Sequence, residues 1–311
     1  MSAMQSGTRS RTVLVAGATG MLGREVVALL HADGYRVKTL SRDPVRAQAL
    51  AGLADEVVLG DAIDPATLVG AMDSVDAVVS CLGAPMAFVA SDRRSFSKVD
   101  TVANLNLLQA AKQAEVRRFV YVSLLMRPSW EQTEYARAHE AVVQGLRDSG
   151  ISHGVVRPTG MFPIFDPFVP MARRGVVCIP GSGQARTNPV HPREVAHACV
   201  AALEETENVS IRLGGPEVLT REDIVRLAFV AAGRKPRIVH LPRWALIACA
   251  FLLRPVHPRL AEVTDFTARA LTADFLAPTG GTHRLGDYFG GARRTPEPSM
   301  MVAVERTKET T

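Results

Sequence analysis

Three glycines near the start of the chain have the spacing of a phosphate-binding turn. They follow an apolar, β-branched run at 12–16 and precede an apolar-periodic segment at 21–31. The first glycine of such a pattern permits a sharp turn, the second lets the backbone approach a pyrophosphate, and the third lets the helix pack closely on the strand. Amides at the start of the helix then point toward the phosphates. Because the glycines lie between an expected strand and an expected helix, they predict a dinucleotide-binding turn. The residues expected to contact the dinucleotide here are Gly17, Thr19, Gly20, Met21, Leu22 and Gly23.

The second expected strand, 37–40, is followed by Ser41 and Arg42 where an NAD-binding site usually has an acidic residue. A carboxylate there would accept hydrogen bonds from the ribose hydroxyls and repel a 2′-phosphate. A hydroxyl and a guanidinium can instead bind that phosphate through charge-assisted hydrogen bonds. The sequence therefore favours NADP(H) as the cofactor. A solvated surface arginine is the alternative interpretation of Arg42.

Further cofactor contacts are expected after the later strands, at 57–59, 77–80, 119–123 and 155–157. The carboxyl ends of parallel strands meet at one edge of the sheet, where ligands of this fold bind. The residues expected at that edge are Asp61, Ala62, Cys81, Leu82, Gly83, Ser123, Pro158, Thr159 and Gly160.

Short apolar strands alternate with long helical patterns across residues 12–160, and two of these helical patterns cover 95–114 and 131–148. Such alternation is typical of a parallel sheet that is covered by helices on both faces. The sequence predicts an α/β fold with a Rossmann-type, doubly wound parallel sheet. A helix at 192–205 is expected to return to this sheet, which assigns 190–215 to the same domain.

Prolines and glycines become frequent after Pro158, and the later helical patterns are broken by prolines. Segments 161–189 and 216–290 are therefore expected to form a smaller, mostly helical C-terminal lobe that caps the substrate. Residues 1–11 are predicted to be a disordered tail without the features of a signal peptide, and residues 291–311 a loose tail. The longest apolar stretch, 244–253, is too short to span a bilayer, so no integral membrane segment is expected. It is expected to be a buried or partner-facing helix, with a membrane-surface role as the lesser alternative.

Composition narrows the class of partner. The chain has 311 residues and a formal net charge of +5, but its arginines are scattered, without a basic helix face or an aromatic platform. These features argue against a nucleic-acid partner and favour a small-molecule substrate. The four cysteines are far apart in apolar surroundings, which predicts buried free thiols, no metal site and a cytoplasmic location. A monomer or a homodimer is expected, with helices 95–114 and 131–149 as a possible dimer face.

Several longer runs resemble the atypical and extended short-chain dehydrogenases/reductases. These are VLVAGATGMLGREVV, SRDP, GDAID and VDTVANLNLLQAAKQAEVRRFVYVS. RDSGISHGVVRPTGMF and RTNPVHPREVAHACVAAL are similar to the NmrA-like, NAD(P)H-binding branch of that superfamily, and GGPEVLTREDIVRLA to the segment that opens its C-terminal lobe. The resemblance covers roughly residues 12–205.

The resemblance implies a catalytic tyrosine four residues before a lysine, with a serine or threonine after the fifth strand. Tyr135 stands in the tyrosine position, His139 in that of the lysine, and Leu124 in that of the hydroxyl, so only the tyrosine matches. His139 could donate to a ribose hydroxyl of the cofactor and, when protonated, support Tyr135. An amphipathic tyrosine on a helix surface is the alternative interpretation of Tyr135. Ser123 is expected to contact the cofactor rather than to act as a nucleophile.

An apolar wall over the nicotinamide is expected from Met161, Phe162 and Phe165, with ordinary lid packing as the alternative. Arg186 and His191 lie in a polar stretch that is expected to return to the cleft, where His191 could contact substrate or cap a helix.

These residues favour an NADPH-dependent reductase that delivers hydride to a small, largely apolar carbonyl or activated alkene, with Tyr135 as the proton donor. One alternative is a non-catalytic NADP(H)-binding sensor or assembly factor of the NmrA type. A second is an epimerase or dehydratase that acts on a nucleotide sugar.

Overall fold

The structure, a computed structural model, describes residues 11–84, 95–291 and 305–308. Its largest sheet has the strand order β12-β9-β6-β5-β4-β1-β2-β3. All neighbouring pairs from β9 to β3 run parallel, and β12 runs antiparallel to β9. The strands are β1 (Thr12–Ala16), β2 (Arg36–Ser41), β3 (Glu56–Leu59), β4 (Ala77–Ser80), β5 (Arg118–Val122), β6 (Ser152–Pro158), β9 (Val209–Leu213) and β12 (Glu305–Lys308). The order 3-2-1-4-5-6 confirms the predicted doubly wound sheet.

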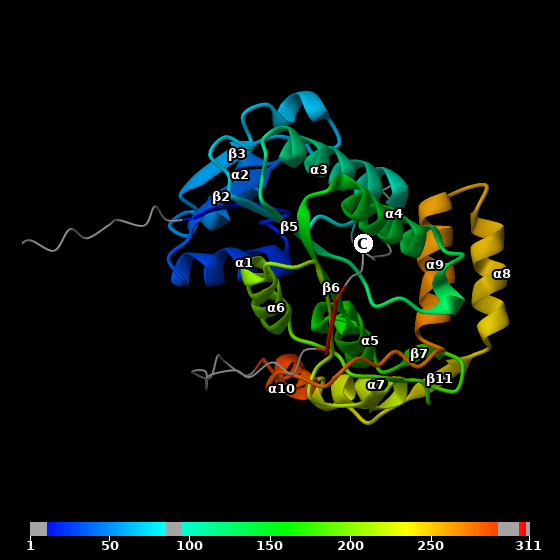
Figure 1. Cartoon of the computed structure of the whole chain (residues 1–311). Helices are drawn as coiled ribbons and strands as arrows, with labels where there is room; N and C mark the ends of the chain where they lie inside the picture. Colours follow the sequence, from blue (N-terminus) through cyan, green and yellow to red (C-terminus); the bar gives the residue numbers. More distant parts are fainter. Residues whose placement is uncertain (1–10, 85–94, 292–304, 309–311) are drawn as a thin grey trace, which may run out of the picture.

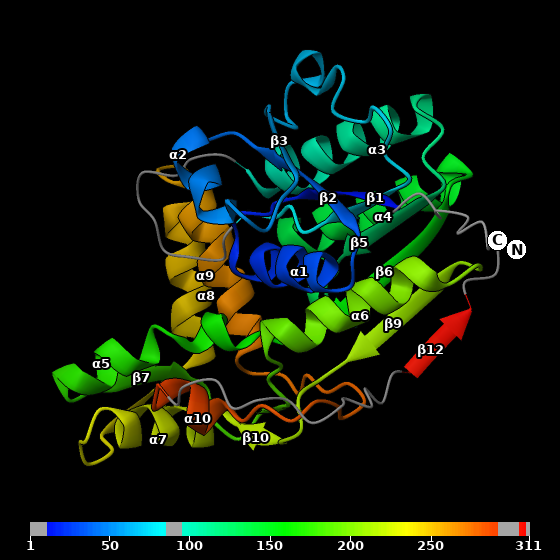
Figure 2. The same ribbon diagram turned by 90° about the vertical axis from the view of Figure 1, so that its left-hand side faces the viewer.

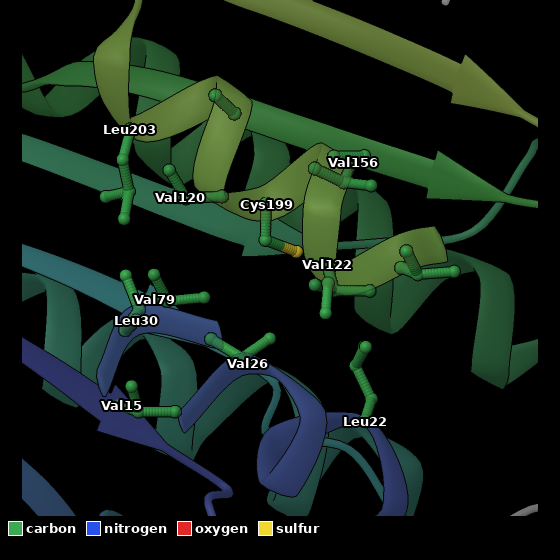
Figure 3. Packing of buried hydrophobic residues seen from close by; sticks show 14 of the residues in the cluster. Val15, Leu22, Val26, Leu30, Val79, Val120, Val122, Val156, Cys199 and Leu203 are labelled. Atoms are coloured by element: carbon green, nitrogen blue, oxygen red, sulfur yellow. The ribbon is translucent and has the colours of Figure 1, made fainter. Parts of the chain in front are cut away.

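Helices cover both faces of this sheet (Figures 1 and 2). α1 (Met21–Ala32) and α6 (Pro192–Glu204) pack on one face, and α3 (Ala103–Gln113) and α4 (Glu134–Ser149) on the other. In Figure 3, α1 presents Leu22, Val26 and Leu30, at the four-residue spacing of one helix face, toward the valines of the strands. Alternate strand residues point to opposite faces, so each strand needs apolar side chains on both sides and reads as a continuous apolar run.

The segment predicted as one helix at 95–114 has two parts. A π-helix, η3 (Ser97–Val102), continues directly into α3. Short connecting helices are α2 (Pro44–Ala47), η1 (Gln48–Leu50), η2 (Pro65–Leu68) and η4 (Pro128–Trp130).

A second layer is built from two separate parts of the chain. Strand β7 (Val177–Pro180) pairs with β11 (Ile238–Leu241), and β8 (Arg186–Thr187) pairs with β10 (Leu219–Thr220), so segments 161–189 and 216–290 lie together. Its helices are η5 (Phe162–Phe165), α5 (Phe168–Arg174), α7 (Arg221–Ala231), α8 (Arg243–Leu253), α9 (Pro258–Ala270) and α10 (Leu285–Phe289). Figure 1 shows α8 and α9 side by side at one edge of the molecule, with α9 toward α4.

The structure corrects three expectations. Residues 305–308 form β12 on the edge of the sheet, although a loose tail was predicted; backbone pairing at an edge needs no apolar periodicity. All four cysteines are free thiols, as expected, but only Cys199 is fully buried. Cys81 is partly buried, and Cys178 and Cys249 are exposed, although buried thiols were predicted. The apolar stretch 244–253 is a largely exposed helix, which corrects the expectation of a buried one; the partner-facing and membrane-surface alternatives stay predictions. The expected N-terminal tail lies outside the described residues except for Arg11.

Among the described residues, no helix is long and apolar enough to cross a membrane.

Candidate active site

The glycine turn between β1 and α1 is closely packed. Gly17 has φ +77°, and a Cβ there would lie 2.7 Å from the carbonyl oxygen of Cys81 at the end of β4. A Cβ on Gly23 would lie 2.2 Å from the carbonyl oxygen of Gly17. The amide of Gly20 donates to the Gly17 carbonyl at 3.0 Å and closes the turn. Two of the three glycines are thus required by backbone geometry alone.

The first turn of α1 is suited to an anion. None of the described side chains caps Gly20, and the first turn carries no acidic residue. Gly20 and Met21 are exposed, whereas Leu22 and Gly23 are buried. Arg24, which sequence reasoning missed, donates from Nε to the Thr19 carbonyl at 3.2 Å. Free amides, the helix dipole and this guanidinium fit the pyrophosphate of a dinucleotide. Arg24 could have been predicted from the sequence, because a basic residue directly follows the third glycine.

At the end of β2, Arg42 lies beside Asp61. The guanidinium of Arg42 is about half exposed, and its Nη1 lies 3.8 Å from Oδ2 of Asp61. Asp61 also accepts from the Ile63 amide at 3.0 Å, and Ser41 Oγ donates to the Asp43 carbonyl at 3.0 Å. An ion pair this long and exposed is weak, so the guanidinium is available to a phosphate.

The other expected cofactor residues lie at the carboxyl ends of their strands. The amides of Cys81, Ser123 and Thr159 donate to carbonyl oxygens on neighbouring strands. The acceptors are Ala16, Val156 and Leu213, respectively. Leu82 is partly buried, Gly83 is exposed, and Ala62 is buried with its carbonyl bonded to Asn106 Nδ2. Pro158 ends β6, and a Cβ on Gly160 would press on the Phe165 ring at 3.1 Å. The sheet topology therefore brings these residues to one edge, where the cofactor roles remain predictions.

His139 makes a buried hydrogen bond that sequence reasoning missed. Its Nδ1 lies 2.6 Å from the hydroxyl oxygen of Tyr121, which comes from β5. Both side chains are buried, and His139 Nε2 has no hydrogen-bond partner within the described parts of the chain. The tyrosine lies eighteen residues away in sequence, so no local spacing could have revealed the pair.

The hydrogen bond between Tyr121 and His139 indicates where the protons of the two side chains lie. Burial raises the pKa of Tyr121 well above its ordinary value, so its hydroxyl keeps the proton. That hydroxyl is satisfied as a donor only if it donates to Nδ1, since leaving a buried O–H unpaired is costly. The proton of the neutral imidazole then lies on Nε2. His139 can therefore donate a hydrogen bond to a ligand without carrying charge.

The electrostatic surroundings of His139 disfavour its protonated form, the form in which it could support Tyr135. Burial, helped by the nearby charge of Arg157, lowers the pKa of His139 to about 3. Arg157 is itself held by Glu140, with Nη1 at 2.6 Å from Oε1, and by the carbonyl of Leu124 at 3.1 Å. A neutral imidazole cannot lower the pKa of a tyrosine as a lysine would.

Tyr135 is partly buried and enclosed by rings. Phe96, Phe266 and His139 contact it edge to face with centroid distances of 4.9, 4.9 and 4.7 Å. Its amide donates to Glu262 of α9 at 3.2 Å. Burial, with the charge of Asp100 as a smaller cause, raises the pKa of Tyr135. The tyrosine is therefore a fixed, protonated side chain that is suited to donate a proton rather than to act as a base.

Asp100 is a second residue that sequence reasoning did not assign to the site. It is fully buried, its Oδ1 accepts from the Ala84 amide at 2.7 Å, and burial raises its pKa to about 7. Its Oδ2 has no partner among the residues described here. Arg259 of α9 stacks on Phe96 at 4.0 Å from the ring centroid and lowers the Asp100 pKa in part.

The predicted substrate residues lie in several places. Phe162 and Phe165 are buried in the core of the C-terminal lobe with Ile224 and Leu285, and Met161 packs against the main core. Arg186 pairs with Asp274, Nη2 to Oδ2, at 2.7 Å. His191 caps α6, where its Nδ1 accepts from the Arg193 amide at 3.1 Å. Each has a structural role; their substrate roles remain predictions.

This arrangement defines a Rossmann-type protein whose expected dinucleotide site lies at the carboxyl edge of its sheet. The sequence matches the NAD(P)H-binding family over residues 17–206. A (4-alkanoyl-5-oxo-2,5-dihydrofuran-3-yl)methyl phosphate reductase of Streptomyces griseus is 34% identical over 74% of this chain and 77% of its own length. The chain therefore belongs to the NAD(P)H-binding family, in the atypical, NmrA-like branch of the short-chain dehydrogenases/reductases.

More distant relatives carry different names. The divinyl chlorophyllide a 8-vinyl-reductase of Zea mays is 28% identical over 82% of this chain and 68% of its own. The photosystem II assembly factor Ycf39 of Guillardia theta is 26% identical over 78% of this chain and 76% of its own length. The NADPH-dependent quinone oxidoreductase QOR2 of Escherichia coli, solved with NADPH, superposes with a TM-score of 0.67 at 19% identity over 90% of this chain and 99% of its own. At that identity it shows the fold alone.

Proposed function

We propose that this protein is an NADPH-dependent reductase of a small, largely apolar carbonyl or activated alkene. The observation that carries the proposal is the protonated Tyr135 hydroxyl, fixed between aromatic rings on the helix that also carries His139. NADPH, when bound, supplies the hydride. The protein's own residues orient the reactants and provide the proton.

Each polar group has one task in this proposal. The amides at the start of α1 hold the pyrophosphate, and the Nε2–H of His139 donates to a hydroxyl of the nicotinamide ribose. The Tyr135 hydroxyl gives its proton to the substrate oxygen as negative charge develops there. For a carbonyl substrate its raised pKa is compatible with this direction, because the alkoxide that forms is a still stronger base.

The nature of the substrate is supported by the surroundings of Tyr135. Trp130, Phe266 and Phe275 form an apolar cluster with Leu124, which stands where a polar hydroxyl is usual. These rings favour a hydrophobic substrate. Two relatives named as reductases, one of them for a vinyl group, support an activated alkene as the acceptor.

Cofactor preference is tested by titrating the protein with NADPH and NADH and following cofactor fluorescence. Arg42→Ala is expected to weaken NADPH binding by roughly ten- to hundredfold and leave NADH unchanged, because it removes a charge-assisted bond to the 2′-phosphate. Arg36→Ala, at the other end of β2, is the matched control. Equal binding of the two cofactors by the unmodified protein would contradict the preference.

Catalysis is tested by a screen of carbonyl compounds and activated alkenes with NADPH oxidation as the readout. Tyr135→Phe is expected to lower kcat by roughly a hundredfold and leave NADPH binding intact. Tyr288→Phe, whose hydroxyl bonds to Asp166 at 3.1 Å elsewhere in the lobe, is the control. An unchanged rate in Tyr135→Phe would remove this residue from the mechanism.

A non-catalytic NADP(H)-binding assembly factor is the second candidate. Leu124 in the hydroxyl position and a neutral His139 favour it, as do the relatives named as assembly factors. Tight NADPH binding without turnover of any compound in the screen would support it over the reductase. An epimerase or dehydratase is disfavoured, because those reactions need an ionised tyrosine and the pKa of Tyr135 is raised.

A further inference from the structure

Helix α8 is apolar on the side that faces away from the protein. Its sequence, RWALIACAFLL, contains no polar residue after Arg243. A helix that is apolar all round is normally buried on all sides or lies in lipid. Here α8 contacts α9, and Ala250 is its only fully buried residue.

The outward residues form one continuous stripe. Trp244, Ala248, Phe251 and Leu252 are exposed, at the i, i+4, i+7 and i+8 positions of a single helix face. Trp244, Phe251 and Leu252 are each more than 70% exposed, and Val256 just beyond the helix is 68% exposed. Figure 1 shows α8 on the far side of α9 from the sheet, at the edge of the molecule. So large an exposed apolar stripe points to a binding surface.

The sequence that contains α8 is basic. From Ile224 to Ala261 the sequence has no acidic residue and seven basic ones. Arg243 and Arg254 stand at the two ends of α8, and Arg234, Lys235 and Arg237 precede it; all five are exposed. Arg243 lines the same hollow as Asp274, but that carboxylate is engaged by Arg186 at 2.7 Å.

We propose that α8 docks this protein on a bilayer surface that contains anionic lipid. The helix would lie parallel to the membrane with Trp244, Phe251 and Leu252 among the upper acyl chains. Tryptophan suits this depth, since its ring is apolar and its N–H polar. Arg243 and Arg254 would meet lipid phosphates at the two ends of the helix.

A second copy of the chain fits this face less well. In a symmetric pair of antiparallel α8 helices, Arg243 of each copy would lie near Arg254 of the other, and no acidic residue between Ile224 and Ala261 could compensate. An anionic lipid surface supplies the missing negative charge.

The full chain is mixed with vesicles of phosphatidylcholine alone or with phosphatidylglycerol added, and bound protein is measured by flotation. Binding is expected only with the anionic lipid and is expected to weaken as salt is raised. The chain has two tryptophans, of which Trp130 is buried and Trp244 is exposed. The emission of Trp244 should therefore shift to the blue on binding, and Trp244→Phe should abolish the shift.

Variants separate the apolar and the charged contributions. The double variant Phe251→Ser and Leu252→Ser is expected to weaken binding by roughly tenfold or more. Arg243→Gln and Arg254→Gln should each weaken it by roughly fivefold. Val69→Ser, at a position that is 84% exposed on the Rossmann domain, is the control for loss of an exposed apolar side chain. NADPH binding measured on every variant reports whether the fold is retained.

Two results would overturn the proposal. One is the absence of binding to anionic vesicles by a protein that binds NADPH. The other is a dimer in solution that the Phe251→Ser, Leu252→Ser variant converts to monomer, which would make this face an interface between copies.

Discussion

At the scale of single residues, the proposed chemistry depends on how His139 is held. A hydroxyl from β5 fixes its Nδ1, and burial keeps it neutral, so its remaining nitrogen is a donor of defined direction. The lysine that is usual at this position adds charge as well as a hydrogen bond. This chain keeps the donor and lacks the charge, which restricts the reactions it can support to those in which tyrosine gives a proton.

Tyr121→Phe tests the positioning role of this hydroxyl. Without the bond to Nδ1, the imidazole is expected to populate both neutral tautomers, and kcat/KM should fall by roughly three- to tenfold through weaker orientation of the cofactor. Nitrogen chemical shifts of the imidazole report the tautomer directly. Tyr35→Phe, which loses a 2.6 Å bond to Glu204, should leave both quantities unchanged. A proton found on Nδ1 in the unmodified protein would refute the assignment.

Asp100 makes stability depend on pH. The native carboxyl holds its proton up to about pH 7, whereas the unfolded chain releases it near pH 4. Raising the pH through this range therefore favours unfolding, by on the order of 4 kcal/mol for this group alone. Asp100→Asn should remove that part of the slope, seen by denaturant unfolding at pH 5 and pH 8. Asp73→Asn is the control on an exposed carboxylate; an unchanged slope in Asp100→Asn would contradict the raised pKa.

At the scale of elements, the packing of α1 on β1 sets the geometry of the phosphate site. Gly23→Ala would force the helix away from the Gly17 carbonyl, so NADPH binding should be lost together with about 1–3 kcal/mol of unfolding free energy. Gly290→Ala is the matched control, since a Cβ there meets its nearest atom at 3.5 Å. Calorimetric titration and thermal unfolding measure both effects. Wild-type affinity in Gly23→Ala would show that the turn does not bind the cofactor.

At the scale of the whole molecule, Glu194 ties the C-terminal lobe to the sheet. This residue of α6 is 1% exposed and accepts from the amides of Thr282 and His283 at 2.6 and 3.0 Å and from His283 Nδ1 at 3.1 Å. The region that packs around Tyr135 also crosses this boundary, because Phe266 and Glu262 come from α9.

Glu194→Ala is expected to lower the unfolding free energy by on the order of 3 kcal/mol, because three hydrogen bonds to a buried carboxylate are lost. Hydrogen exchange at Thr282 and His283 should accelerate more than exchange in β1. Glu217→Ala removes a more exposed ion pair to Arg284 and should cost less than about 1 kcal/mol. Equal effects of the two substitutions would argue against Glu194 as the link.

The sequence by itself determined the sheet, the glycine turn and the family. The order of apolar strands and helices is a local pattern, and the phosphate site needs only a strand, three glycines and a helix start that are contiguous in the chain. Arg42 could be predicted as a cofactor residue for the same reason, since its position directly after β2 is also a local feature of the sequence.

Only the tertiary structure decided which side chains meet at Tyr135. Phe96 and Asp100 come from the segment at η3, Tyr121 from β5 and Phe266 from α9, and the approach of these three segments depends on how α4 and α9 pack over the sheet. The same holds for α8: its composition suits a buried helix, and its exposure follows from α9 covering only one of its sides. Periodicity shows that a helix has an apolar face, whereas the presence of a neighbour for that face depends on contacts between segments distant in the chain.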